Sequence, residues 1–192
     1  MTANSAPGIS RDDALVLLKE YLKNDNLVSH CIASEAIMRA LARKLNQDED
    51  VWGIAGLLHD IDYEITNGEL TRHGKEAPGI LLSKGVSSEI ADAIKNHNAE
   101  GLGLERSTLL DHALTCAESI TGLIVATALV YPDKKVASVK PKSITKRMKQ
   151  KEFARSVNRE HIRECEKIGI PLEQFAELSL KAMREISDVL GL

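Results

Sequence analysis

Aromatic residues are scarce in this sequence, which holds two Phe, one Trp and three Tyr among its 192 residues. Because β-sheets favour aromatic and β-branched residues, a chain poor in aromatics and rich in Ala, Leu, Ile, Lys and Glu favours helices. Hydrophobic residues make up 43% and charged residues 28%, an ordinary globular mixture that excludes disordered and collagen-like classes. No convincing run of strands is present either, so the sequence predicts an all-α fold.

Cysteine is also scarce. Cys31, Cys116 and Cys165 lie far apart without any CxxC spacing, which excludes a disulfide framework and a thiolate zinc site. The first ten residues lack the basic and then apolar order of a secretory signal. The longest apolar stretch, residues 120–131, is shorter than the roughly 20 residues of a membrane span. We therefore expect a cytoplasmic protein with no membrane contact.

Net positive charge is confined to residues 134–155, and the rest of the chain is net negative. Nine Lys and Arg against Glu152 give this segment +8, which leaves −11 for the rest of a chain whose total is −3. Such asymmetry indicates an anion-binding feature, and its alternatives are a solvated face or a nucleic-acid contact. Only Phe153 lies in the segment, so a stacking surface for single-stranded nucleic acid is not expected.

Capping residues and apolar periodicity predict where the helices lie. Helices are expected to begin near Ser10, Asn26, Asp48, Ser87 and Thr108, with a last amphipathic helix over residues 172–190. The polar side chains of six residues fall on inward faces of these helices or at their ends. They are His30, His59, Asp60, His73, His97 and Glu118.

Imidazoles and carboxylates without thiolates suit one or two divalent ions of the kinds Mn, Zn, Fe, Co or Mg. The six residues are spread over several consecutive helices, and a helical bundle can bring such side chains together at its centre. The sequence therefore predicts a metal centre. Asp111 and His112 form a second acidic and basic pair. We expect a capping or solvated role for Asp111, and we expect His112 and His161 to be surface or packing residues.

The ordered set resembles the HD-domain superfamily of metal-dependent phosphohydrolases, whose pattern is a helix histidine, an adjacent His-Asp pair and a later helix aspartate. It is most similar to the HDIG-type subgroup, which carries two further histidines. The matching positions are His30, His59 and Asp60 in LLHDIDYE, His73 in TRHGKEAPGILL, His97 in AIKNHNAE, and residue 118 in TCAESITGLIVA. Two positions depart from the pattern: Glu118 stands where the family usually has Asp, and Asn98 stands where some relatives have a second histidine.

The resemblance implies an HD-domain helical bundle with a basic segment and a C-terminal helical extension. Its implied parts are an N-terminal tail and helix over residues 1–24, the metal-binding domain over 25–131, and a basic segment with C-terminal helices over 132–192 packed on that domain. One ion would be held by His30, His59, Asp60 and Glu118, with Asp60 bridging to a second ion on His73 and His97.

The implied activity is hydrolysis of a phosphate ester by metal-activated water, on a nucleotide or another small phosphorylated molecule. Asp60 and Asp62 are the predicted catalytic residues, with Asp62 and Lys75 as acid/base groups or as partners of the ligands. Phosphate charge would be neutralised by Lys134, Lys135, Lys140, Lys142 and Arg155.

Two alternatives remain open at this stage. A di-iron oxygenase could use a similar scaffold, and a catalytically silent, metal-stabilised module could bind nucleotide or nucleic acid through the basic segment. We expect a monomer or a homodimer.

Overall fold

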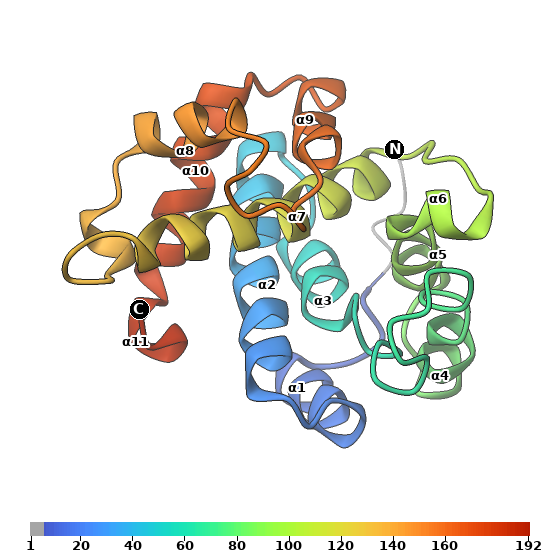
Figure 1. Ribbon diagram of the computed structural model, residues 1–192. Helices are drawn as coiled ribbons and strands as arrows, with labels where there is room; N and C mark the ends of the chain where they lie inside the picture. The colour runs from blue at the N-terminus through green and yellow to red at the C-terminus, as the bar shows by residue number, and fades with distance from the viewer. Residues whose placement is uncertain (1–5) are drawn as a thin grey trace.

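The computed structural model describes residues 6–192, and within this range the chain is helical with no strand, which confirms the all-α prediction. Figure 1 shows the long helices α2 and α7 crossing near the middle of the molecule. The elements are α1 (Arg11–Tyr21), α2 (Asp25–Leu45), α3 (Glu49–Leu58), α4 (Ala77–Ser83), α5 (Ser88–His97), α6 (Ala99–Leu102), α7 (Leu109–Leu129), the 3-10 helix η1 (Val136–Ser138), α8 (Pro141–Met148), α9 (Arg159–Lys167), α10 (Leu172–Glu185) and α11 (Ser187–Leu190).

Several helix starts follow from local hydrogen bonds that the sequence predicts. Ser10 caps α1 by accepting the N–H of Asp13 at 3.1 Å. Asp48 caps α3, and Thr108 forms a capping box with Asp111 at the start of α7. A side-chain oxygen at these positions satisfies N–H groups that have no partner within the helix. The capping role expected for Asp111 is therefore confirmed, although its side chain is buried rather than solvated.

Two features of the C-terminal third differ from the sequence-based expectation. The last helix is not continuous, because it breaks at Ile186 into α10 and α11. Helix α9 was not predicted. Only Ile162 and Cys165 are buried within it, and two apolar positions are too few to show a helical period.

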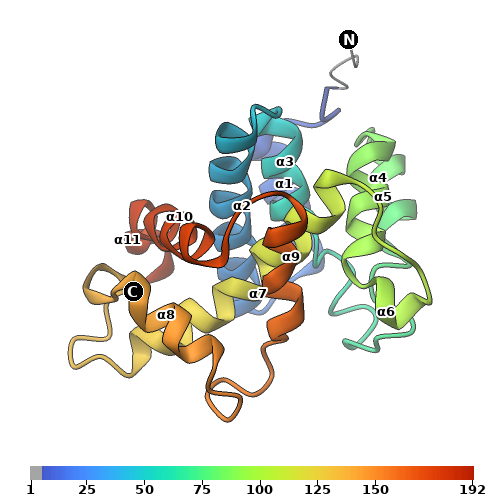
Figure 2. The same cartoon turned by 90° about the horizontal axis from the view of Figure 1, so that it is seen from above.

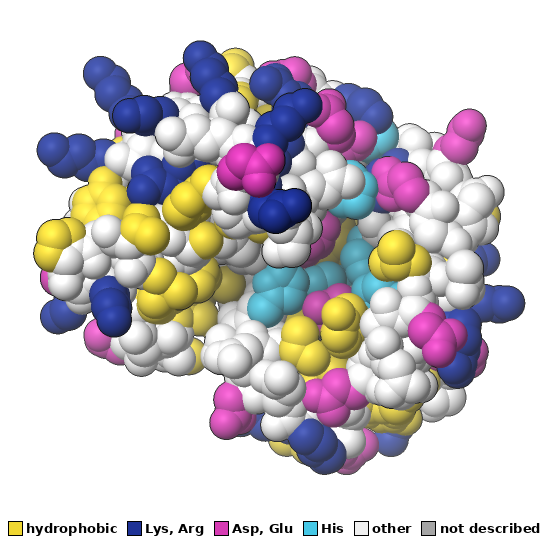
Figure 3. All heavy atoms as spheres, viewed as in Figure 1, with side chains coloured by type: hydrophobic (Ala, Val, Ile, Leu, Met, Phe, Trp, Pro, Cys, Tyr) yellow, Lys and Arg dark blue, Asp and Glu magenta, His cyan; other side chains and the backbone are white. Residues whose placement is uncertain are grey.

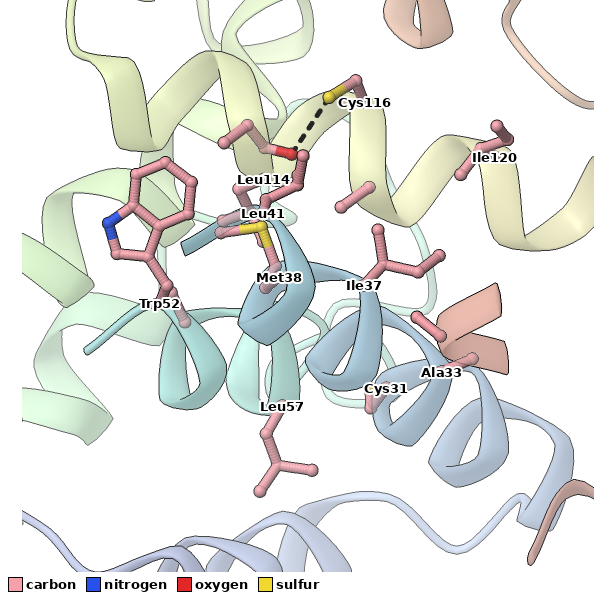
Figure 4. Packing of buried hydrophobic residues seen from close by; sticks show 14 of the residues in the cluster. Cys31, Ala33, Ile37, Met38, Leu41, Trp52, Leu57, Leu114, Cys116 and Ile120 are labelled. Carbon is pink, nitrogen blue, oxygen red and sulfur yellow. Dashed lines mark hydrogen bonds between the residues drawn. The ribbon is translucent and has the colours of Figure 1, made fainter. Parts of the chain in front are cut away.

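The core lies where α2, α3 and α7 meet. Figure 4 shows Ile37 and Met38 of α2 on the side that faces Leu114 of α7, while Leu57 of α3 points to the opposite side, and all four side chains are fully buried. Burying such a side chain contributes about 1.5–3 kcal/mol. The packing of these buried side chains holds α2, α3 and α7 together, and it thereby fixes the positions of the polar side chains that these helices carry.

Helix α7 is long and apolar enough to cross a membrane by length and composition alone. Most of its apolar stretch is buried against the neighbouring helices, however. Helix α7 is therefore the core helix of the bundle.

The C-terminal helices pack on this core, with α8 and α9 against α7 and α10 against α2. Figures 1 and 2 both show α9 beside the first half of α7. Arg159 organises the loop before α9 by donating hydrogen bonds at 2.6 Å to the carbonyls of Ala154 and Val157. Arg184 of α10 donates in the same way to the carbonyls of Val136 and Val139 around η1.

A candidate metal centre

The predicted ligands come from four helical segments and one loop. His59 directly follows the last residue of α3, and Asp60 follows it in the chain. His73 lies in the loop between α3 and α4, and His97 is the last residue of α5. His30 lies in α2 and Glu118 in α7.

Five of these six side chains meet in two groups that share Asp60. In the first group, Nε2 of His30 lies 3.1 Å from Nε2 of His59 and 3.7 Å from Oδ2 of Asp60. In the second, Nε2 of His73 lies 2.9 Å from Nε2 of His97 and 3.2 Å from Oδ1 of Asp60. The carboxylate of Asp60 therefore stands between two pairs of imidazole nitrogens.

The two groups differ in their access to solvent. The second group is buried, whereas the His30 side chain of the first is 25% exposed. Figure 3 shows histidine side chains gathered with acidic ones at a hollow in the middle of this face. A small molecule can reach the centre from the His30 side.

The rings of His59 and His97 are oriented by carbonyl groups of their own helices. Nδ1 of His59 lies 2.9 Å from the carbonyl oxygen of Gly56, and Nδ1 of His97 contacts that of Ile94. The last carbonyls of a helix lack intrahelical partners, so a histidine at the helix end can donate to them. A proton on Nδ1 leaves Nε2 as a free lone pair that faces the site.

The ring of His73 is oriented by Asp62. Oδ1 of this fully buried carboxylate lies 2.8 Å from Nδ1 of His73, and Asp62 also accepts the backbone N–H groups of Gly74, Glu76 and Ala77. Burial raises the pKa of Asp62, but these hydrogen bonds outweigh it and lower the pKa below its ordinary value. Asp62 was expected to be either an acid/base group or a hydrogen-bond partner of a metal ligand, and its contact with His73 favours the second role.

Asn98 supports the same loop. Its side-chain amide donates to the carbonyls of Leu70 at 2.7 Å and of His73 at 2.8 Å. The position where some relatives have a second histidine therefore holds the His73 loop in place.

The ring of His30 is oriented by Thr121 of α7. The Thr121 hydroxyl lies 2.8 Å from Nδ1 of His30 and donates its only proton to the carbonyl of Glu118 at 2.6 Å. It must therefore accept the Nδ1 proton of His30. The lone pair of Nε2 then points at His59.

These orientations make the site suited to a cation. Two nitrogen lone pairs that face each other at 2.9–3.1 Å repel unless a positive charge lies between them. Two imidazoles bound to one ion, each at about 2.1 Å, lie about 3.0–3.4 Å apart, which is close to these separations. Ligating histidines in metal sites donate their other N–H to a carbonyl or a carboxylate, as His59, His97 and His73 do.

Proton affinities in the metal-free chain agree with this reading. Burial lowers the pKa of His73, yet its hydrogen bonds to Asp60 and Asp62 outweigh this and raise the pKa to about 9. Burial, with help from His73 and His59, lowers the pKa of His97 to about 4. A proton on His73 therefore supplies the positive charge that an ion would otherwise bring to the second group.

Glu118 is the one predicted ligand that falls outside both groups. Ser119 donates to its Oε1 at 2.5 Å, and Nδ1 of His161 lies 3.9 Å from the same oxygen. Burial raises the pKa of Glu118, but His161 and the nearby His30 and His59 lower it below its ordinary value. Glu118 thus lies beside the first group, and its role as a ligand stays a prediction. His161, expected to be a surface or packing residue, is half-buried and faces this carboxylate.

The cations predicted to bind phosphate are all exposed. Lys134, Lys135, Lys140 and Lys142 follow the C-terminal end of α7, and the side chain of Arg155 is 78% exposed near Glu152. Lys75 is exposed as well. Phosphate contact through these residues stays a prediction.

Sequence reasoning missed Thr121 as a functional residue. Its position three residues after Glu118, on the same face of one helix, was the signal that could have found it. The carbonyls of Gly56 and Ile94 carry no such signal, because any residue type supplies a carbonyl. His112, expected to pack or to lie at the surface, pairs with Glu164 of α9.

Comparison with protein families gives a match to the HD domain over residues 27–127, just over half of the chain. The matched range contains both groups of metal-ligating atoms. No solved structure matches the chain.

Proposed function

This chain belongs to the HD-domain family, whose members are generally phosphohydrolases, and we propose that it hydrolyses a small phosphate ester with metal-activated water. The observation that carries the proposal is the pair of ligand groups sharing Asp60, with the Nδ1 of every histidine already engaged. Such a centre binds positive charge without rearranging its side chains.

The residues that would hold the ions are His30 and His59 on one side, His73 and His97 on the other, and Asp60 between them. Bound divalent ions supply hydroxide near neutral pH and stabilise negative charge on the phosphoryl group. In the first group, the Nε2 lone pairs of His30 and His59 face each other. In the second group, the hydrogen bond to Asp62 keeps Nε2 of His73 directed into the site.

Asp60 is the residue on which both groups depend. Burial raises its pKa, but His59, His73 and His30 lower it far below its ordinary value, which favours the ionised form of Asp60. Asp60 would contribute to holding both ions, because it belongs to both groups, and the exposed basic segment would attract a phosphorylated substrate. A nucleotide is one such substrate.

The test replaces Asp60 by Asn and measures two properties. Elemental analysis gives metal content, and p-nitrophenyl phosphate with bis(p-nitrophenyl) phosphate reports monoesterase and diesterase turnover under Mn²⁺, Zn²⁺, Co²⁺, Fe²⁺ and Mg²⁺. Asp60→Asn should lose bound metal and at least 100-fold in turnover, while the exposed Asp92→Asn should retain both. Turnover that survives Asp60→Asn rejects the proposal.

Two additional assays, one for O₂-dependent oxidation by the iron-loaded protein and one for nucleic-acid binding, separate the alternative functions. Turnover that requires both iron and O₂ would assign a di-iron oxygenase. Metal binding without any turnover, together with salt-dependent binding of nucleic acid, would assign a binding module.

A further inference from the structure

A pocket of 520 Å³ adjoins the metal centre on its exposed side. His30 and Thr121 line one end of it, and Asn26 and Ser29 add the remaining polar side chains. Among the residues that the structure describes, no Lys, Arg, Asp or Glu lines the pocket. Its other side chains are aliphatic: Ala33, Val125, Ala126, Leu129, Leu190 and Leu192.

The pocket leads away from the metal centre along α7. Thr121, Val125 and Leu129 follow one another at steps of four residues, so they lie on one face of the helix. From Thr121 to Leu129 this face is about 12 Å long, given a rise of 1.5 Å per residue. Leu129 remains 50% exposed at the far end. Figure 3 shows hydrophobic side chains gathered on the same face as the histidines.

Leu190 and Leu192 at the C-terminus complete the walls of the pocket. The pocket is thus built by residues about 160 positions apart, next to the ligand that is most exposed. Its volume lies within the range of small-molecule sites, about 300–1,000 Å³, and such sites are mostly apolar with few polar groups. These features describe a binding site for part of a substrate.

We propose that this pocket binds the alcohol part of the phosphate ester, and that this part is an aliphatic chain. The inference rests on the proposed hydrolase function, since it places the phosphoryl group at the metal centre. No Phe, Tyr or Trp side chain lines the pocket in the described range, and the one ring that does, the imidazole of His30, is held by Thr121 and His59 at the metal centre. A nucleobase therefore finds no large stacking surface along the pocket. Aliphatic walls instead favour an alkyl group by removing it from water.

The reaction would be R–O–PO₃²⁻ + H₂O → R–OH + HPO₄²⁻. The water oxygen bonds to phosphorus and the bond from phosphorus to the alkyl oxygen breaks. One water proton passes to the released alcohol and the other stays on the phosphate. The alkyl group R lies in the pocket throughout.

The first experiment compares ethyl, butyl and hexyl phosphate with the Mn²⁺-loaded protein. Each buried methylene stabilises by about 0.8 kcal/mol, which is about fourfold at 25 °C. We expect kcat/KM to rise about 100-fold or more from ethyl to hexyl phosphate. A kcat/KM that does not change with chain length overturns the proposal.

A matched pair of variants locates the effect. Ala126→Phe fills the pocket and should reduce the hexyl-to-ethyl ratio of kcat/KM at least tenfold. Ala40→Phe is the control, because Ala40 is also partly buried but lies on α2 about 15 Å along the helix from His30, in a different groove. Thermal unfolding shows whether both variants are folded. Leu129→Ser, at an exposed position, should also lower the hexyl-to-ethyl ratio of kcat/KM, without repacking the core.

Binding of alkylphosphonates, which are not hydrolysed, separates this inference from the proposed function. If no ester turns over but hexylphosphonate binds far more tightly than ethylphosphonate, the hydrolase function fails and the pocket assignment stands. If esters turn over without chain-length dependence, only the pocket assignment fails. A wild-type dimer that dissociates on Leu129→Ser would show that a second copy covers the pocket, and would overturn the assignment.

Discussion

Replacing Asp62 by Asn should leave the chain folded and weaken the binding of one metal ion. Oδ2 of Asp62 accepts three backbone N–H groups, from Gly74, Glu76 and Ala77, whereas Oδ1 faces His73 and only shares the N–H of Gly74 with Oδ2. Asn has one acceptor oxygen, and three donors favour placing it at the Oδ2 position. The amide NH₂ group then faces Nδ1 of His73, which must become an acceptor and carry its proton on Nε2.

The size of the effect follows from these contacts. A His73 protonated on Nε2 cannot coordinate an ion, and loss of such an orienting partner typically costs 10–100-fold in metal affinity. We expect that loss at the second group only, because the rings of His30 and His59 have other partners. Loss of the charge on Asp62 should also lower the free energy of unfolding by about 1.5–3 kcal/mol.

Titration calorimetry of the metal-free protein with Mn²⁺ measures the affinity, and urea unfolding in the presence of a chelator measures the stability. The control is Asp111→Asn, which removes the charge of another buried carboxylate that accepts backbone N–H groups but contacts no predicted ligand. It should destabilise the chain by a similar amount and leave metal affinity unchanged. Equal metal affinity in Asp62→Asn and wild type, or equal losses in both variants, would refute the reasoning.

Two further changes test other parts of the structure. Thr121→Val keeps the shape of the side chain but removes the acceptor for Nδ1 of His30, so calorimetry should show about 10–100-fold weaker binding at the first group and an unchanged second group. For Glu164, burial raises the pKa, but hydrogen bonds from a neighbouring lysine and from His112 lower it below the ordinary value, so its ionised form stabilises the fold. Glu164→Gln should therefore cost about 1 kcal/mol at pH 7. The difference from wild type should shrink as the pH falls below the ordinary pKa of glutamate and vanish below the lowered pKa of Glu164, as urea unfolding across pH can show.

The clustering of five of the predicted ligands could be predicted from the sequence because it depends on residue identity and order. His30, His59, Asp60, His73 and His97 all reach the groups where they were expected. Helix starts such as that of α3 were predictable for a similar reason, since a cap acts within three residues. By contrast, nothing near Ile186 signals a break, because neither Gly nor Pro is present there.

The position of Glu118 and the apolar pocket lay beyond the sequence for a different reason. The pairing of Glu118 with Ser119 and the approach of His161 depend on how α9 packs against α7. The pocket depends on where α11, which contains Leu190, packs against α2. Neither packing contact has a local pattern, so only the three-dimensional structure reveals it.

The position of each histidine within its helix determines what must orient it. His59 and His97 stand at helix ends, where carbonyls of the last turn lack partners and can accept the Nδ1 proton. His30 lies inside α2, where the carbonyls are already bonded, so its ring needs an acceptor from another helix, and Thr121 of α7 supplies it. The first ligand group therefore depends on the packing of α2 against α7. Residues of the same two helices line the apolar pocket, so a group bound there contacts both His30 and Thr121, the residue that orients its ring.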